Sequence, residues 1–205
     1  MVRLDPARPL VICDADEVLL RFLAGLERFL ERNGCYLDLT SFRIHGNVKY
    51  RATHEAVADE TVTKLIGDFF ASDTRYLEPV DGAAAALKNL SNHAQIVILS
   101  NLPESSRDAR IENLVEHGMP YPVIAGKGPK GPVVKDLLGD FAQTVVFIDD
   151  LPPNLSSVAT ETPHVHRLHF IADPRLACLL PPAADAHRRI DDWPTAAEWI
   201  ATVIA

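Results

Sequence analysis

The chain has 205 residues, of which 47% are hydrophobic and 23% are charged, and this globular composition excludes a largely disordered protein. A chain of this length forms one large domain or a core domain with a small insert. Its formal net charge of −8 argues against a general nucleic-acid-binding protein, which normally carries a basic surface.

The cysteine pattern and the apolar runs narrow the class further. Three cysteines are scattered without a CxxC pair, and the first residues do not resemble a signal peptide. We therefore expect neither a disulfide framework nor a zinc site. No apolar stretch reaches the roughly 20 residues that a membrane helix needs, which predicts a soluble, cytoplasmic protein without a membrane partner.

The first predicted element is a buried strand at residues 10–13, an apolar run that follows Pro9. Two carboxylates, Asp14 and Asp16, come directly after it. An unpaired buried charge is very costly, so this strand must end at water, a metal or a ligand. In open α/β sheets, ligands bind beyond the carboxyl ends of the strands. Taken alone, the two acids could equally form a solvated turn or a helix cap.

The next segment is predicted to be helical. Apolar residues at helical spacing mark residues 19–33, and Asn33-Gly34 ends that helix. Residues 35–51 lack a clear period, so we expect them to be irregular. Thr53 is the expected N-cap of a second helix. Residues 20–77 are too long for a single crossover, and we interpret them as an inserted helical cap, or lid.

The remaining elements alternate between helix and strand. Strands are expected at residues 96–99, 121–125, 145–148 and 165–171, helices at residues 82–90, 104–117, 132–138, 154–159 and 194–204, and loops over residues 175–192. Such alternation predicts an α/β fold with a parallel, Rossmann-like sheet of about five strands and helices on both faces. The core domain would comprise residues 1–19 and 78–205, with the helical cap of residues 20–77 over the carboxyl edge of the sheet.

Polar side chains end three of the predicted strands: Asp14 and Asp16, Ser100 and Asn101, and Asp149 and Asp150. Because the carboxyl ends of parallel strands share one edge, these side chains can converge. Several carboxylates at one place repel one another unless a cation joins them. Mg²⁺ fits best, because it takes oxygen ligands and usually shares its shell with a phosphate. Lys127 or Lys130, on a glycine-rich stretch, can bring an ammonium group to the same edge.

These motifs resemble those of the haloacid dehalogenase-like superfamily of aspartate-nucleophile hydrolases, which are mostly phosphatases. Its first motif, a strand followed by DxDx[TV], stands at residues 14–18, and its second, a strand ending in serine or threonine, at residues 96–101. Its third, a lysine ahead of the fourth strand, corresponds to Lys130, with Lys127 as the alternative, and its fourth, an acidic pair, is Asp149-Asp150. The resemblance spans residues 9–155. The second aspartate, Asp16, implies the phosphatase branch, and the insert implies a helical, C1-type cap.

The resemblance also implies roles for these residues. Asp14 would be the nucleophile that forms an aspartyl-phosphate, and Asp16 the general acid and base. The implied Mg²⁺ ligands are Asp14, Asp16 through its carbonyl, and Asp150 or Asp149. The implied phosphate-binding residues are Ser100, Asn101 and Lys130, of which Ser100 and Lys130 would also meet the charge of the transition state.

We therefore predict an Mg²⁺-dependent phosphomonoester hydrolase that acts on a small soluble phosphorylated metabolite, since a lid encloses little more than that. The alternatives are a phosphotransferase, a phosphonate-type or other hydrolase on the same scaffold, and a non-catalytic phosphate- or partner-binding protein. The intact motifs count against the non-catalytic alternative. A receiver domain also clusters acids with a lysine, but its phosphorylated aspartate follows a middle strand. The oligomeric state stays open.

Substrate specificity is expected to come from the insert, because the core motifs bind only the phosphoryl group. Residues 43–54 concentrate positive and aromatic side chains, and we assign specificity there to Arg43, Lys49 and Arg51. Such a patch suits a second anionic or planar group, as in a nucleotide or sugar phosphate; a solvated surface is the alternative. Glu17 stands where the family often has glycine, so it would either face solvent or repel a second anion. The three histidines at positions 164, 166 and 169 are interpreted as structural.

Overall fold

Parallel pairing around the buried strand β1 (Leu10–Cys13) organises the chain. The computed structural model describes residues 2–205, and over these residues six strands form one sheet in the order β5-β4-β1-β6-β7-β8. The other strands are β4 (Gln95–Asn101), β5 (Val123–Gly126), β6 (Val145–Asp149), β7 (His166–His169) and β8 (Arg188–Arg189). All neighbouring strands run parallel. The predicted α/β fold is confirmed, with β8 as an additional strand in the stretch that was expected to be loops.

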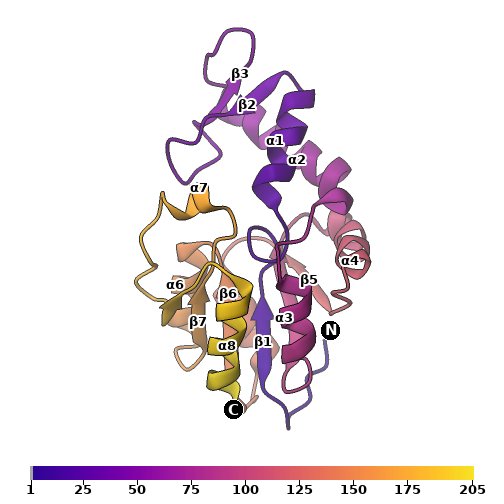
Figure 1. Ribbon diagram of the computed structural model, residues 1–205, viewed down its shortest axis with the longest axis vertical. Helices are drawn as coiled ribbons and strands as arrows, with labels where there is room; N and C mark the ends of the chain where they lie inside the picture. Colours follow the sequence, from indigo (N-terminus) through magenta and orange to yellow (C-terminus); the bar gives the residue numbers. More distant parts are fainter. Residues whose placement is uncertain (1) are drawn as a thin grey trace.

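Helices cover both faces of this sheet. Val11 and Cys13 of β1 join a hydrophobic cluster with α3 (Ala83–Leu90) and α8 (Trp193–Ile204), while Leu10 and Ile12 join a second cluster with α5 (Lys130–Leu138) and α6 (Pro152–Glu161). In Figure 1, α3 and α8 lie in front of the sheet and α6 lies behind it. Successive side chains of a strand point to opposite faces, so covering both faces explains why the strands are continuous apolar runs. The short helix η2 (Glu104–Ser106) and α4 (Arg107–Glu116) connect β4 to β5.

The insert contains two α-helices, the short helix η1 and a β-hairpin, which corrects the expectation that it is helical throughout. Its elements are α1 (Phe22–Arg32), β2 (Cys35–Leu37), β3 (Val48–Tyr50), α2 (Asp59–Asp73) and η1 (Thr74–Tyr76). Strands β2 and β3 pair antiparallel across the stretch that was expected to be irregular. Each strand has only three residues and one buried side chain, Cys35 or Val48, so no alternation is long enough to be recognised in the sequence.

The predicted N-cap of the second helix was also wrong. Helix α2 begins at Asp59, not after Thr53. Thr53 instead accepts a hydrogen bond from the Glu55 N–H at 3.3 Å, and His54 between them has a left-handed backbone with φ of 60°. A left-handed residue cannot continue an α-helix, so the chain turns here before the helix starts.

The insert leaves and rejoins the core through two adjacent segments. The Arg21 N–H donates to the Glu78 carbonyl, and the Val80 N–H donates to the Leu19 carbonyl, both at 2.8 Å. In Figure 1 the insert stands above the carboxyl edge of the sheet, and the loop between β2 and β3 descends towards α7 (Pro174–Ala177). We propose on this basis that residues 20–77 form a lid on the rest of the chain. Over residues 2–205, no helix is both long and apolar enough to span a membrane.

Candidate active site

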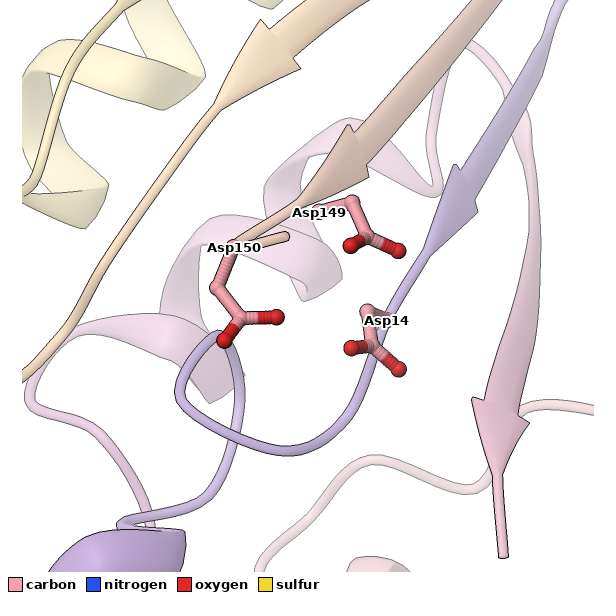
Figure 2. Close-up of side chains that lie close together, drawn as sticks. All are labelled: Asp14, Asp149 and Asp150. Carbon is pink, nitrogen blue, oxygen red and sulfur yellow. The ribbon is translucent and has the colours of Figure 1, made fainter. Parts of the chain in front are cut away.

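Asp14 and the acidic pair after β6 lie side by side because β1 and β6 are neighbours. Cys13 pairs with Ile148, and the Asp14 N–H continues the ladder by donating to the Ile148 carbonyl at 2.9 Å. Figure 2 shows the carboxylates of Asp14, Asp149 and Asp150 gathered at this edge of the sheet. All three are buried, and one oxygen of each lies within 4.8 Å of the others. Hard oxygen donors at this spacing fit a divalent cation such as Mg²⁺.

Lys130 is the cation that the fold supplies to this cluster. It is the first residue of α5, and its Nζ lies 2.7 Å from Asp14 Oδ1 and 2.7 Å from Asp149 Oδ2. Its side chain is 1% exposed, which such a charged group tolerates only when it is paired. Lys127 is exposed on the preceding loop. The structure thus brings Lys130, and not Lys127, to the carboxylates.

The two residues of the acidic pair have different surroundings. Asp149 Oδ2 accepts from Lys130, and its Oδ1 accepts from the Leu151 N–H and from Asn154 Nδ2, both at 2.9 Å. Its carboxylate is therefore largely occupied by protein donors. Asp150 lines the same cavity as Asp14, which leaves it as the better placed direct metal ligand.

The charges of the cluster do not balance without a further cation. Burial raises the pKa of Asp14 to about 7, against the opposing effect of Lys130. Burial also raises the pKa of Asp150 well above its usual value, and the neighbouring Asp149 and Asp14 add to this. Burial works against the Lys130 ammonium, but Asp14 and Asp149 outweigh it and raise its pKa. Three carboxylates thus face one ammonium group, and a divalent cation would meet the remaining charge.

Ser100 and Asn101 are the last two residues of β4, which pairs with β1 on the side away from β6. Ser100 is fully buried, and its Oγ has no hydrogen-bond partner within residues 2–205. A buried hydroxyl group without a partner is costly, so this one suits an oxygen of a bound anion. Asn101 lines the cavity, but its Nδ2 donates to the Gly128 carbonyl at 2.9 Å. Its side-chain amide therefore ties β4 to the loop before Lys130.

Asp16 has a partner that sequence reasoning missed. Arg110 Nη2, from α4, donates to Asp16 Oδ1 at 2.7 Å. The Arg110 side chain is fully buried, whereas that of Asp16 is 18% exposed. The available signal was the position of Arg110 on the helix, since it shares the buried face of α4 with Asn113 and Leu114. A charged residue on such a face needs a buried partner.

Glu17 is buried, so the expectation that it could face solvent is wrong. Its side chain accepts from the Leu23 N–H at 2.6 Å and from the Asp173 N–H at 3.0 Å. Its backbone is left-handed, with φ of 56°, which turns the chain from the sheet edge into the lid. Glu17 thereby joins the first turn of α1 to the segment before α7. Burial is also the main cause that raises the pKa of Glu17 to about 7.

A cavity of about 340 Å³ opens above these residues, between the sheet edge and the insert. Asp14, Asp16, Glu17, Asn101, Asp150 and Asn154 line its floor, and Arg43 lies on its wall. The other two predicted specificity residues do not line it. Lys49 pairs with Asp38 at 2.5 Å, and Arg51 pairs with Glu31 at 2.7 Å. Of the three, only Arg43 therefore lies where a molecule in the cavity could contact it.

His169, on β7, contacts the backbone of the acidic pair. It is fully buried, with Nε2 at 3.0 Å from the Asp150 carbonyl and Nδ1 at 3.1 Å from the Ala183 backbone nitrogen. These contacts hold the backbone of the acidic pair against the loop after α7. His164, by contrast, is exposed, and the His166 ring lies next to that of His187.

Comparison with known proteins identifies the fold. No protein-family model matches the sequence, and no curated protein matches it. Among solved structures, a haloacid dehalogenase-like protein of unknown function from Agrobacterium tumefaciens is 19% identical, with a TM-score of 0.64 over 96% of this chain and 99% of that one. A HAD hydrolase from Bacillus subtilis in a magnesium-bound structure is 11% identical, with a TM-score of 0.64 and coverage of 94% and 98%.

A third similar structure is a HAD family hydrolase from Deinococcus radiodurans with bound phosphate and sodium. It is 15% identical, with a TM-score of 0.63 and coverage of 97% of both chains. The chain thus has the haloacid dehalogenase-like fold over 94–97% of its length, as the order of its motifs predicted. At sequence identities of 11–19%, the similarity to these structures shows a shared fold and not a shared activity.

Proposed function

We propose that this protein is an Mg²⁺-dependent phosphomonoester hydrolase that acts on a small molecule through an aspartyl-phosphate. One observation carries the proposal: Asp14 and Asp16 line the same cavity, with Lys130 held between Asp14 and Asp149. A nucleophilic carboxylate, a second carboxylate for proton transfer and a buried cation are what a two-step phosphoryl transfer to water requires. Two of the similar structures, one bound to magnesium and one with bound phosphate, support this choice.

In the first step, an Asp14 carboxylate oxygen attacks phosphorus while the bond from phosphorus to the ester oxygen breaks. Asp16 donates a proton to that oxygen, so the alcohol half of the substrate leaves as a neutral alcohol. Asp14 must be ionised to attack. Its pKa is raised to about 7 even with Lys130 beside it, so a further cation is needed to favour the carboxylate at neutral pH.

In the second step, Asp16, now ionised, takes a proton from water. The water oxygen attacks the phosphorus of the aspartyl-phosphate, which releases inorganic phosphate and restores Asp14. Ser100 Oγ and Lys130 Nζ donate to the phosphoryl oxygens, whose charge must be met in both transition states.

Mg²⁺ would be held by Asp14, Asp150 and the Asp16 carbonyl, and when bound it offsets the repulsion between the carboxylate and the phosphate. Asp149 remains the acceptor that holds Lys130, Leu151 and Asn154 in place. The lid encloses the cavity, so the substrate is small.

The test is phosphate release from a panel of phosphate esters, with Mg²⁺ and with EDTA. Asp14→Asn should lower the rate of phosphate release by at least about a thousandfold, since the amide cannot form the acyl-phosphate. The matched control is Asp108→Asn, at an exposed position on α4, which should keep full activity. Phosphate release that persists in Asp14→Asn contradicts the mechanism. Halide release from haloacids without any phosphate release would reassign the protein to dehalogenation, and transfer of phosphate to an added alcohol in preference to water would make it a phosphotransferase.

A further inference from the structure

The lid contributes mainly apolar side chains to the walls of the cavity. The apolar wall side chains from the lid are Phe22, Leu23, Leu39, Phe42, Ile44, Ile66 and Phe70. They offer no hydrogen bonds. A sugar or nucleoside bound against them would leave its hydroxyl groups without partners, and each such buried group is costly. The walls therefore favour a substrate whose alcohol half is itself apolar.

Two polar side chains, Arg43 and His45, interrupt this apolar wall. His45 Nε2 lies 3.0 Å from Thr63 Oγ1 and so has a partner on α2. The Arg43 guanidinium makes no ion pair or hydrogen bond within residues 2–205. In contrast, other arginines of the lid pair with acids, such as Arg28 with Glu78 and Arg51 with Glu31. Arg43 is thus a cation at the cavity with its charge left for a ligand.

Arg43 is carried by a loop with a defined shape. The buried Asn47 donates from Nδ2 to the Ser41 carbonyl at 2.8 Å and to the Arg43 carbonyl at 2.7 Å. Its Oδ1 accepts from Thr40 Oγ1 at 2.9 Å. These bonds fix the backbone of residues 40–43, so binding an anion at Arg43 requires little ordering of the loop.

The same loop is anchored to the core. Leu39 and Phe42 pack in one apolar cluster with Leu176 of α7. Arg175, beside it, pairs with Glu27 of α1 at 2.8 Å. The loop, α1 and α7 therefore line the cavity together, and the contact with α7 anchors the loop that carries Arg43.

We propose that the natural substrate is the phosphate monoester of an aromatic or branched aliphatic alcohol that carries a carboxylate remote from the phosphate. This inference rests on the proposed function. The phosphate would lie on the floor beside Asp14, the apolar body against the aromatic side chains of the lid, and the carboxylate at Arg43. Glu17 and the floor acids repel a second anion near the phosphate, so the carboxylate must lie at the far end. A cavity of about 340 Å³ suits a molecule of this size.

The test compares matched esters. The phosphate of 3-(4-hydroxyphenyl)propanoate has the carboxylate, and the phosphate of 4-propylphenol lacks it. We expect kcat/KM to be about tenfold or more higher for the carboxylate ester, as a charge-assisted hydrogen bond gives. Both esters should be better substrates than ribose 5-phosphate. Arg43→Gln should bring the ratio of the two aryl esters close to one. The control Arg51→Gln, on an exposed lid arginine, should keep the ratio.

A second measurement separates this inference from the proposed chemistry. Binding of the free acid 3-(4-hydroxyphenyl)propanoate and of 4-propylphenol is measured by calorimetry with the wild type and with Arg43→Gln. Tighter binding of the acid that disappears in Arg43→Gln supports the recognition even if no ester is hydrolysed, in which case only the proposed reaction fails. If phosphate is released but the ester ratio does not depend on Arg43, or if ribose 5-phosphate is preferred, the inference is overturned while the phosphatase proposal stands.

Discussion

Arg110 Nη2 donates a hydrogen bond of 2.7 Å to Asp16 Oδ1, which joins two residues 94 positions apart. Helix α4, which carries Arg110, also holds the end of the lid. Asn113 Nδ2 donates to the Arg75 carbonyl at 2.7 Å and to the Leu77 carbonyl at 2.9 Å. The orientation of Asp16 is therefore connected, through one helix, to the segment where the lid rejoins the core.

We predict that Arg110 positions Asp16 for proton transfer. A general acid matters most for a poor leaving group, because a good one departs without a proton. Arg110→Met should therefore lower kcat for an alkyl phosphate more than for p-nitrophenyl phosphate, by about tenfold or more, and Asp16→Ala should show the same pattern more strongly. The double variant should lose little beyond Asp16→Ala alone. The control Arg107→Met, one turn earlier on α4, should not discriminate between the two esters. Equal losses on both esters in Arg110→Met would contradict the positioning role.

The metal prediction depends on the different surroundings of the acidic pair. Mg²⁺ should raise the thermal midpoint of the protein, because it binds only the folded state. Asp150→Asn should remove this rise and most of the activity. In EDTA, however, Asp150→Asn should be no less stable than the wild type, since the substitution removes a buried carboxylate that is repelled by Asp14 and Asp149. Asp149→Asn should instead lower the midpoint with or without Mg²⁺, because it removes the negative charge that pairs with Lys130 and one of the two oxygens that accept hydrogen bonds. A normal Mg²⁺ response in Asp150→Asn would show that the ion binds elsewhere.

Lys127, on the loop before α5, and Lys130, the first residue of α5, should behave differently. Lys130→Met leaves Asp14 and Asp149 buried without their ammonium, which should cost about 3–5 kcal/mol of stability and most of the turnover. Lys127→Met changes an exposed side chain and should leave the free energy of unfolding within about 0.5 kcal/mol of the wild type. Denaturant unfolding and steady-state kinetics measure both effects. If Lys127→Met proved the more damaging variant, the motif would have to be reassigned.

The fourth prediction concerns pH. Burial raises the pKa of Glu17 from 4.5 to about 7, so the folded protein binds this proton more tightly than the unfolded chain does. The contribution of Glu17 to stability is then fully present below about pH 4.5 and is lost as pH rises to about 7. The thermal midpoint of the wild type minus that of Glu17→Gln should fall over this window in EDTA. For Glu60→Gln, at an exposed position of α2, the difference should be the same at pH 5 and pH 8. A flat profile for Glu17→Gln would contradict the predicted titration.

Local patterns in the sequence determined the framework of the molecule. The apolar runs at residues 10–13, 96–99 and 145–148 are short, continuous and followed by polar residues, and all three are confirmed as parallel strands of the central sheet. Strand character and burial depend on a few consecutive residues. The sequence therefore sufficed to predict an α/β fold whose sheet has about five strands. The order of the strand-end motifs likewise predicted the haloacid dehalogenase-like fold. The roles of the site residues stay predictions until the proposed variants are measured.

Only the tertiary structure decided which side chains meet. Glu17 is bonded to the Asp173 N–H across 156 positions, and Arg110 to Asp16 across 94, and no local period connects such residues. Lys127 and Lys130 look alike in the sequence, but only Lys130, the first residue of α5, has its ammonium group at the carboxylates. Arg43, Lys49 and Arg51 form one basic stretch, yet a hairpin with strands of three residues turns only Arg43 towards the cavity. Such contacts depend on how the elements pack, because the free energy of a buried charge is determined by partners that folding brings from elsewhere in the chain.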